Sequence, residues 1–208
     1  MSRAPWLDGE LEYRSFGTPG APRAVFVLRT GAVATTDPDP RITSGHDVRI
    51  VAIGLDAPEL EDPPAFGGQT PAGLTVDALK DLMEREAPET TVGLVGERSA
   101  GPIAVHLAAA MGARVDRLAL VGVMSPSDAL SRDMRTPMLD DLQARTLVLI
   151  GEDGTPDAAD AEWYRDRIPA AQVEVVDAGR YDNAQGQVTL SSAWETVLEH
   201  VAPGAARR

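Results

Sequence analysis

The sequence predicts an α/β protein with a mostly parallel, doubly wound sheet in a single domain. Short apolar runs rich in β-branched residues alternate with helix patterns, and the connections between them are short. Residues 90–107 pass from one such run, through a turn of small residues, into an apolar helix pattern. Continuously apolar strands are typical of parallel sheets that helices cover on both faces. A chain of 208 residues is long enough to form one domain with a substantial core.

Composition excludes several kinds of site. The chain has no cysteine, so disulfides, thiolate nucleophiles and sulfur metal ligands are all excluded. A formal net charge of −13 argues against a nucleic-acid partner, which would require a basic face. The first ten residues have no apolar stretch of signal-peptide length, and no window approaches the roughly 18 apolar residues of a membrane span. We therefore expect a soluble cytoplasmic protein without membrane contacts.

The first half of the chain predicts three strands and a long loop. Residues 10–16 alternate enough for an edge strand. Residues 24–29 and 48–55 are apolar throughout, as buried strands are. Residues 56–73 are rich in proline and glycine and are long enough to form a pocket wall or a mobile lid.

The second half predicts helices that alternate with strands. An amphipathic helix is expected over residues 75–86, with Thr75 as its N-cap. After the central stretch, the chain should form strands over 117–124, 145–150 and 172–176, and helices over 157–168 and 189–201. Residues 1–202 form the expected domain, and residues 203–208 are expected to fray.

The central turn, Gly96 to Gly101, resembles the nucleophile elbow of the α/β-hydrolase family. In that family, G-x-S-x-G joins the fifth strand to the next helix. The small residues that a sharp turn requires are present, since Gly96 lies two residues before the nucleophile position and Ala100 two after it. Arg98 occupies the nucleophile position itself. Ser99 is one residue further on, where its side chain is expected to point along the start of the helix.

The resemblance covers nearly the whole chain, and it implies further site positions. The family places an acid after its seventh strand, where this chain has Gly154 with Asp153 beside it, and a histidine after its eighth, where this chain has Arg180. The first buried strand ends Arg29-Thr30-Gly31, where the family has His-Gly beside its oxyanion hole. The family also inserts cap domains where residues 125–141 lie, but this segment is too short for more than a helix, so no sizeable cap is expected.

These departures argue against ordinary serine-hydrolase chemistry. Arginine keeps its protons throughout the working pH range, so it cannot be the general base that a serine nucleophile needs. His46, His106 and His200 are expected to be structural or solvated. No histidine pair has metal-ligand spacing, and residues 37–40 are expected to form a turn, so neither a metal nor another cofactor is predicted.

Three arginines are expected to converge where strands end at one edge of the sheet. Arg29, Arg98 and Arg180 would there bind a carboxylate, a phosphate or a developing oxyanion. Alternatively, nearby acids such as Glu97 seal the site by pairing with them. Backbone N–H groups of Ser99 and of the residues after Arg29 could still form an oxyanion hole. The predicted catalytic residues are Arg98, Ser99, Arg180 and Asp153, and the predicted ligand-binding residues are Arg29, Thr30, Gly31, Glu97 and Tyr181.

Three functions remain open at this point. The first is an enzyme that transfers an acyl group or activates a small carbonyl substrate without a covalent serine intermediate; analogy within the fold suggests secondary metabolism. Its substrate could be tethered to a carrier protein. The second is a non-catalytic binding protein for a small anionic ligand, and the third is a scaffold with a vestigial pocket. A dinucleotide-binding fold is a weak alternative, because the glycines of the central stretch do not form G-x-G-x-x-G.

Overall fold

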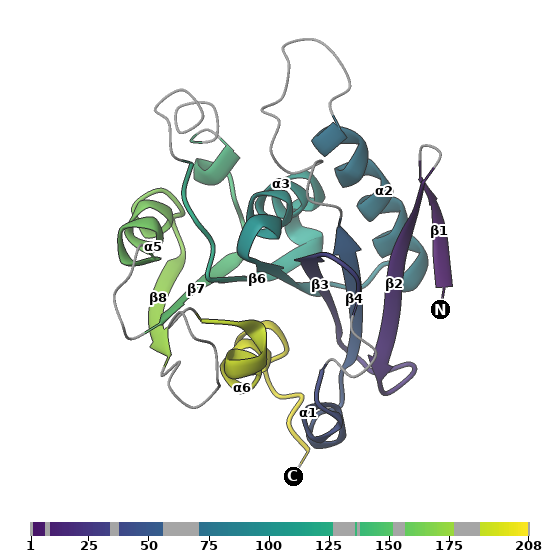
Figure 1. The fold of residues 1–208 in the computed structure, drawn as a ribbon. Coiled ribbons are helices and arrows are strands. Elements are labelled where there is room, and N and C mark those ends of the chain that lie inside the picture. Colours follow the sequence, from purple (N-terminus) through teal and green to yellow (C-terminus); the bar gives the residue numbers. More distant parts are fainter. Residues whose placement is uncertain are drawn as a thin grey trace.

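One eight-stranded sheet forms the centre of the protein (Figure 1). The computed structural model describes residues 2–6, 9–33, 38–55, 71–126, 136, 138–151, 157–176 and 188–207. The strand order is β1-β2-β4-β3-β5-β6-β7-β8, with β1 and β2 antiparallel to their neighbours and the other strands parallel. The strands are β1 (Ser2–Trp6), β2 (Gly9–Gly17), β3 (Ala24–Thr30), β4 (Arg49–Leu55), β5 (Val92–Glu97), β6 (Val115–Val121), β7 (Arg145–Gly151) and β8 (Ala171–Val176).

Helices cover both faces of this sheet, as the apolar strand patterns predict. Figure 1 shows α2 and α3 on one face and α6 on the other. Along β3, Phe26 and Leu28 face the core beneath α2 and α3, whereas Val25 and Val27 face the core beneath α6. The described helices are α1 (Pro40–Gly45), α2 (Pro71–Glu86), α3 (Gly101–Met111), α5 (Asp157–Arg165) and α6 (Leu190–Val201), with short 3₁₀ turns η2 (Arg98–Ala100) and η3 (Gly112–Arg114).

The strand order places a topological switch beside the central turn. Strand β3 is followed in the chain by β4 on one side, and the chain then crosses back to form β5 on the other side. At such a reversal, the carboxyl ends of the two flanking strands leave a crevice in which α/β proteins bind ligands. Leu28 of β3 pairs with Gly96 of β5, so the residues that follow each lie at this crevice.

Two expectations about individual elements are wrong. Residues 10–16 are not an edge strand, because β2 lies between β4 and the additional strand β1. Thr75 does not cap a helix either, since α2 begins at Pro71 and Thr75 is fully buried within it. The expected apolar face of this helix is confirmed, since Leu79, Leu82 and Met83 are fully buried. The expected loop over 56–73 lies mostly outside the described residues, as does the segment over 125–141.

Residues near the C-terminus hydrogen-bond to residues at and just after the end of α1, while the fraying of residues 203–208 stays a prediction. The N–H of Asp47 donates to the Ala205 carbonyl at 2.6 Å, and the N–H of Arg207 donates to the Gly45 carbonyl at 2.8 Å. These bonds continue an isolated antiparallel bridge between His46 and Ala206. The last residues therefore brace the end of α1. Among the described residues, no helix is both long enough and apolar enough to cross a membrane.

Candidate functional site

Arg98 lies at the apex of the turn that joins β5 to α3. Its φ is +52°, and the only other described residue besides glycine with a positive φ is Glu89. A residue with a Cβ in the left-handed region costs about 1–2 kcal/mol. Arg98 is thus one of two such strained positions, and it lies where the resemblance places the nucleophile. Ser99 follows inside η2.

Small residues allow β5 and α3 to approach closely behind this apex. A Cβ on Gly96 would lie 2.7 Å from the Cβ of Ala104 and 2.9 Å from the Cα of Gly101. A Cβ on Gly101 would clash with the side chain of Val123, which lies two residues beyond the end of β6. These glycines are therefore required by packing, independently of any catalytic role.

Glu97 is a buried cross-link between three elements. Its side chain is 8% exposed, and its Oε2 lies 3.1 Å from a guanidinium nitrogen of Arg29, at the end of β3. Its Oε1 accepts a hydrogen bond of 2.9 Å from the N–H of Leu190, the first residue of α6. A buried carboxylate requires such partners. The alternative in which Glu97 pairs with an arginine is thus confirmed for Arg29, while a ligand contact by Glu97 stays a prediction.

The residues after Arg29 are also engaged. Gly31, with a φ of +82°, donates its N–H to the Leu55 carbonyl at 2.9 Å. Contrary to the expectation, this N–H therefore does not serve as an oxyanion donor. Thr30 Oγ1 accepts a long hydrogen bond of 3.4 Å from Ser99 Oγ. Because Ser99 contacts Thr30 in this way and not a histidine, the described residues show no base positioned to activate its hydroxyl.

Two of the three histidines contact backbone carbonyls, and neither of these two contacts Ser99 in the described part of the chain. His46 follows α1, and its Nδ1 lies 2.8 Å from the Ile42 carbonyl. His200 is near the end of α6, and its Nε2 lies 3.0 Å from the Arg145 carbonyl, at the start of β7. Both contacts are structural, as expected. His106 is half-buried within α3.

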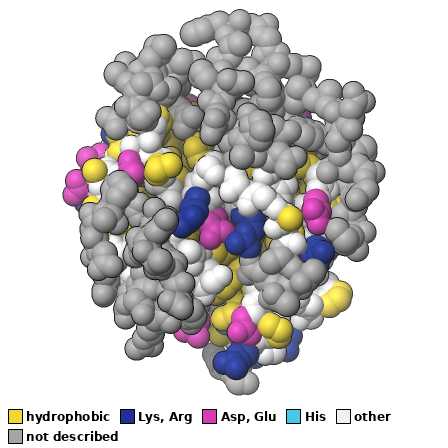
Figure 2. Space-filling model, viewed as in Figure 1, with side chains coloured by type: hydrophobic (Ala, Val, Ile, Leu, Met, Phe, Trp, Pro, Cys, Tyr) yellow, Lys and Arg dark blue, Asp and Glu magenta, His cyan; other side chains and the backbone are white. Residues whose placement is uncertain are grey.

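Arg98 lies near Gly122, the residue that directly follows β6. A Cβ on Gly122 would lie 3.9 Å from the Cγ of Arg98, so the aliphatic part of this arginine packs beside Gly122. The side chain of Arg98 is nevertheless exposed. Figure 2 shows acidic and basic side chains gathered near the centre of one face of the molecule. Arg29 is the last residue but one of β3, and Arg98 directly follows the neighbouring strand β5. Asp153, Arg180 and Tyr181 lie outside the described residues, so the convergence of three arginines stays a prediction.

Comparisons with known proteins identify the fold. No family model matches the chain, and no curated protein sequence does. Solved structures do match over nearly the whole chain. A predicted CIB-like hydrolase from Thermoplasma acidophilum is 13% identical with a TM-score of 0.65, covering 94% of this chain and 92% of its own. MGS-M2, an α/β hydrolase from a Medee basin deep-sea metagenome library, is 12% identical with a TM-score of 0.65, and the match covers 95% and 96%.

MenH from S. aureus is a third structure of this kind. It is 12% identical with a TM-score of 0.65, and the match covers 88% of this chain and 94% of that one. Identities this low carry information about the fold and none about the reaction. Together with the mostly parallel sheet and the turn at Arg98, these structural matches show that this protein has the α/β-hydrolase fold.

Proposed function

We propose that this protein uses the α/β-hydrolase fold without a covalent serine intermediate, and that it acts on a small acyl or carbonyl substrate bound at Arg98. The observation that carries the proposal is the backbone of Arg98, which keeps the strained apex conformation with a side chain that cannot be a nucleophile. Strain of this kind is found at functional sites more often than elsewhere. An acyl transfer would then require a nucleophile from the second substrate.

The proposed chemistry consists of positioning and electrostatic stabilisation. The guanidinium group of Arg98, a residue that is exposed as a whole, would bind a carboxylate, a phosphate or the developing oxyanion of an acyl group. The acceptor's nucleophile would attack the acyl carbonyl, the bond to the leaving thiol or alcohol would break, and the acceptor's proton would pass to that leaving group. Holding both reactants in place can itself supply much of the rate enhancement.

A second candidate is a non-catalytic binding protein or scaffold. It is favoured by the Glu97 carboxylate, which pairs with Arg29 and with the N–H of Leu190. Such structural contacts are expected at a site whose charged residues stabilise the fold and do not take part in a reaction. In that case, Arg98 would bind an anion and release it unchanged.

Acyl transfer to hydroxylamine tests the first candidate directly. The purified protein is incubated with short-chain acyl thioesters and hydroxylamine, and the hydroxamate is measured by its iron complex. We expect saturable hydroxamate formation that Ser99→Ala leaves unchanged and that Arg98→Ala lowers by about 100-fold, the typical effect of removing one oxyanion donor. Arg165→Ala removes another exposed arginine, on α5, and is the matched control.

Three results separate the candidates. Stoichiometric labelling of Ser99 by a fluorophosphonate, with ester hydrolysis that Ser99→Ala abolishes, would identify an ordinary serine hydrolase. Absence of turnover, together with a rise in melting temperature on addition of a small carboxylate or phosphate that Arg98→Ala removes, would favour the binding protein. Absence of both turnover and anion-dependent stabilisation would favour a scaffold with a vestigial pocket.

A further inference from the structure

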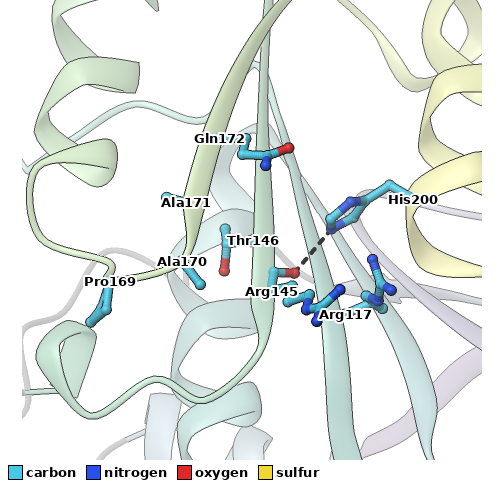
Figure 3. Close-up of a pocket in the computed structure, with 8 residues that line it drawn as sticks. All are labelled: Arg117, Arg145, Thr146, Pro169, Ala170, Ala171, Gln172 and His200. Carbon is cyan, nitrogen blue, oxygen red and sulfur yellow. Dashed lines mark hydrogen bonds between the residues drawn. The ribbon is translucent and has the colours of Figure 1, made fainter.

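A pocket of about 380 Å³ opens at the amino ends of three strands, on the opposite side of the sheet from the turn at Arg98 along the strand direction (Figure 3). It lies at the amino ends of β6, β7 and β8 and beside the end of α6, whereas Arg98 follows the carboxyl end of β5. The two sites are therefore separate. The lining residues are Arg117, Arg145, Thr146, Pro169, Ala170, Ala171, Gln172 and His200.

Two arginines stand directly beside one another in this pocket. Arg117 of β6 is paired in register with Arg145 of β7, and paired residues of parallel strands place their side chains on the same face of the sheet. Figure 3 shows the two side chains close together below the ring of His200. Like charges opposite one another on neighbouring strands are destabilising. A pair of this kind therefore calls for a compensating negative charge.

The described residues do not supply that charge. No ion pair is found for Arg117 or Arg145 in the part of the chain that the structure describes, although the chain carries a net charge of −13. The neighbouring carboxylate, Asp116, is paired with Arg23 instead. Asp116 therefore forms its ion pair outside the pocket.

His200 adds a polar group to the pocket without adding charge. Its Nε2 lies 3.0 Å from the Arg145 carbonyl, and a carbonyl can only accept, so Nε2 carries the hydrogen. Burial lowers the pKa of His200; the hydrogen bond to Arg145 opposes this shift, and the charge of Arg117 reinforces it. The Asp116 carboxylate and a hydrogen bond to the Leu118 backbone also oppose the shift, and the net result is a lowered pKa, which favours the neutral ring at pH 7. The cationic groups of the pocket are the two guanidinium groups.

We propose that this pocket binds a small organic anion, with a phosphate or carboxylate group between Arg117 and Arg145 and an apolar part against Pro169, Ala170 and Ala171. Guanidinium groups match the geometry of both kinds of anion through paired hydrogen bonds. A volume of about 380 Å³ lies within the range of small-molecule pockets and exceeds what a bare anion fills. The proposal is independent of the function proposed for the elbow.

A structural role for the two arginines is the principal alternative. Helix α6 ends at this edge, and the partial negative charge of a helix C-terminus is stabilised by nearby cations. Under this alternative, replacing an arginine would lower stability, and no saturable anion binding would be found.

Calorimetric titration with phenyl phosphate and with benzoate separates these possibilities. We expect saturable binding of at least one probe, and the stronger of the two identifies the anionic group that the pocket prefers. Arg117→Gln and Arg145→Gln should each raise the dissociation constant by about tenfold or more. The titrations are made in the Arg98→Ala background, which removes the anion site proposed at the turn, and Arg41→Gln, which replaces an exposed arginine on α1, should leave the dissociation constant unchanged. Arg145 is exposed, so its variant should fold even where Arg117→Gln does not.

The proposal is overturned by any of three results. The first is no saturable binding of either probe at millimolar concentration. The second is weakening by Arg41→Gln as large as that by Arg145→Gln, which would assign the anion to another site. The third is a dimer in analytical ultracentrifugation that Arg145→Glu dissociates, since an acidic segment of a second copy would then fill the pocket.

Discussion

Replacing Glu97 with alanine tests whether one buried carboxylate holds the elbow to the rest of the fold. This side chain joins the end of β5 to Arg29 on β3, at 3.1 Å, and to the N–H of Leu190 on α6, at 2.9 Å. Alanine removes both contacts at once. Glu97→Gln keeps an oxygen that can accept from Leu190 and removes only the charge.

The size of the effect follows from what each variant leaves unpaired. A buried N–H without an acceptor costs about 1–3 kcal/mol. Breaking a buried ion pair costs about 3–5 kcal/mol, but the Arg29 side chain is 21% exposed and keeps some contact with water. We therefore expect Glu97→Ala to lower the free energy of unfolding by about 3 kcal/mol, and Glu97→Gln by about 1–2 kcal/mol.

Urea unfolding followed by circular dichroism measures these differences, with the free energy in water obtained by linear extrapolation. The matched control is Glu84→Ala. The Glu84 carboxylate pairs with Arg114 at 2.8 Å but is 53% exposed, so its loss should cost less than about 1 kcal/mol. Equal losses in Glu97→Ala and Glu84→Ala, or a loss below 1 kcal/mol in Glu97→Ala, would refute the cross-link.

Three further predictions concern backbone strain, packing and pH. Arg98→Gly should raise the free energy of unfolding by up to about 1 kcal/mol, because glycine relieves the strain at a φ of +52° but loses more chain entropy on folding. Glu89→Gly, at a φ of +58°, should raise it by a similar amount, and only Arg98→Gly should change activity or ligand binding at the turn. Gly96→Ala should lower the free energy of unfolding by about 1–3 kcal/mol, because the added methyl group would lie 2.7 Å from the Cβ of Ala104 in α3. A methyl group added at Gly45 meets nothing within 4 Å, so Gly45→Ala should be nearly neutral. Equal loss of stability in both variants would contradict the packing argument. Burial lowers the pKa of His200 below its ordinary 6.5, so below this pH the unfolded chain binds a proton more tightly than the folded protein, and the free energy of unfolding should decline as the pH falls. Between pH 7 and pH 5, the urea midpoint should decline less in His200→Gln than in the unchanged protein. Identical declines would disprove this role of His200.

Local sequence patterns determined most of the fold. Apolar β-branched runs and helix periodicity depend only on neighbouring residues, and they predicted the parallel strands and the helices between them. The turn is also a local feature, and its glycines with Arg98 at the apex could be identified from the sequence alone. Strand β1 was missed because the first residues lack a clear alternation, and the α2 start was misplaced because Thr75 resembles a cap in sequence yet is buried in the helix.

The partners of the charged residues were decided only by the tertiary structure. Glu97 and Leu190 are 93 residues apart, and a backbone N–H at a helix start has no signature that names its acceptor. Arg117 and Arg145 become neighbours through the register of β6 against β7, which local periodicity does not specify. The sequence could therefore indicate which side chains carry charge, whereas strand pairing and helix docking decided that Arg29 is paired and that two other arginines share a pocket at the opposite edge.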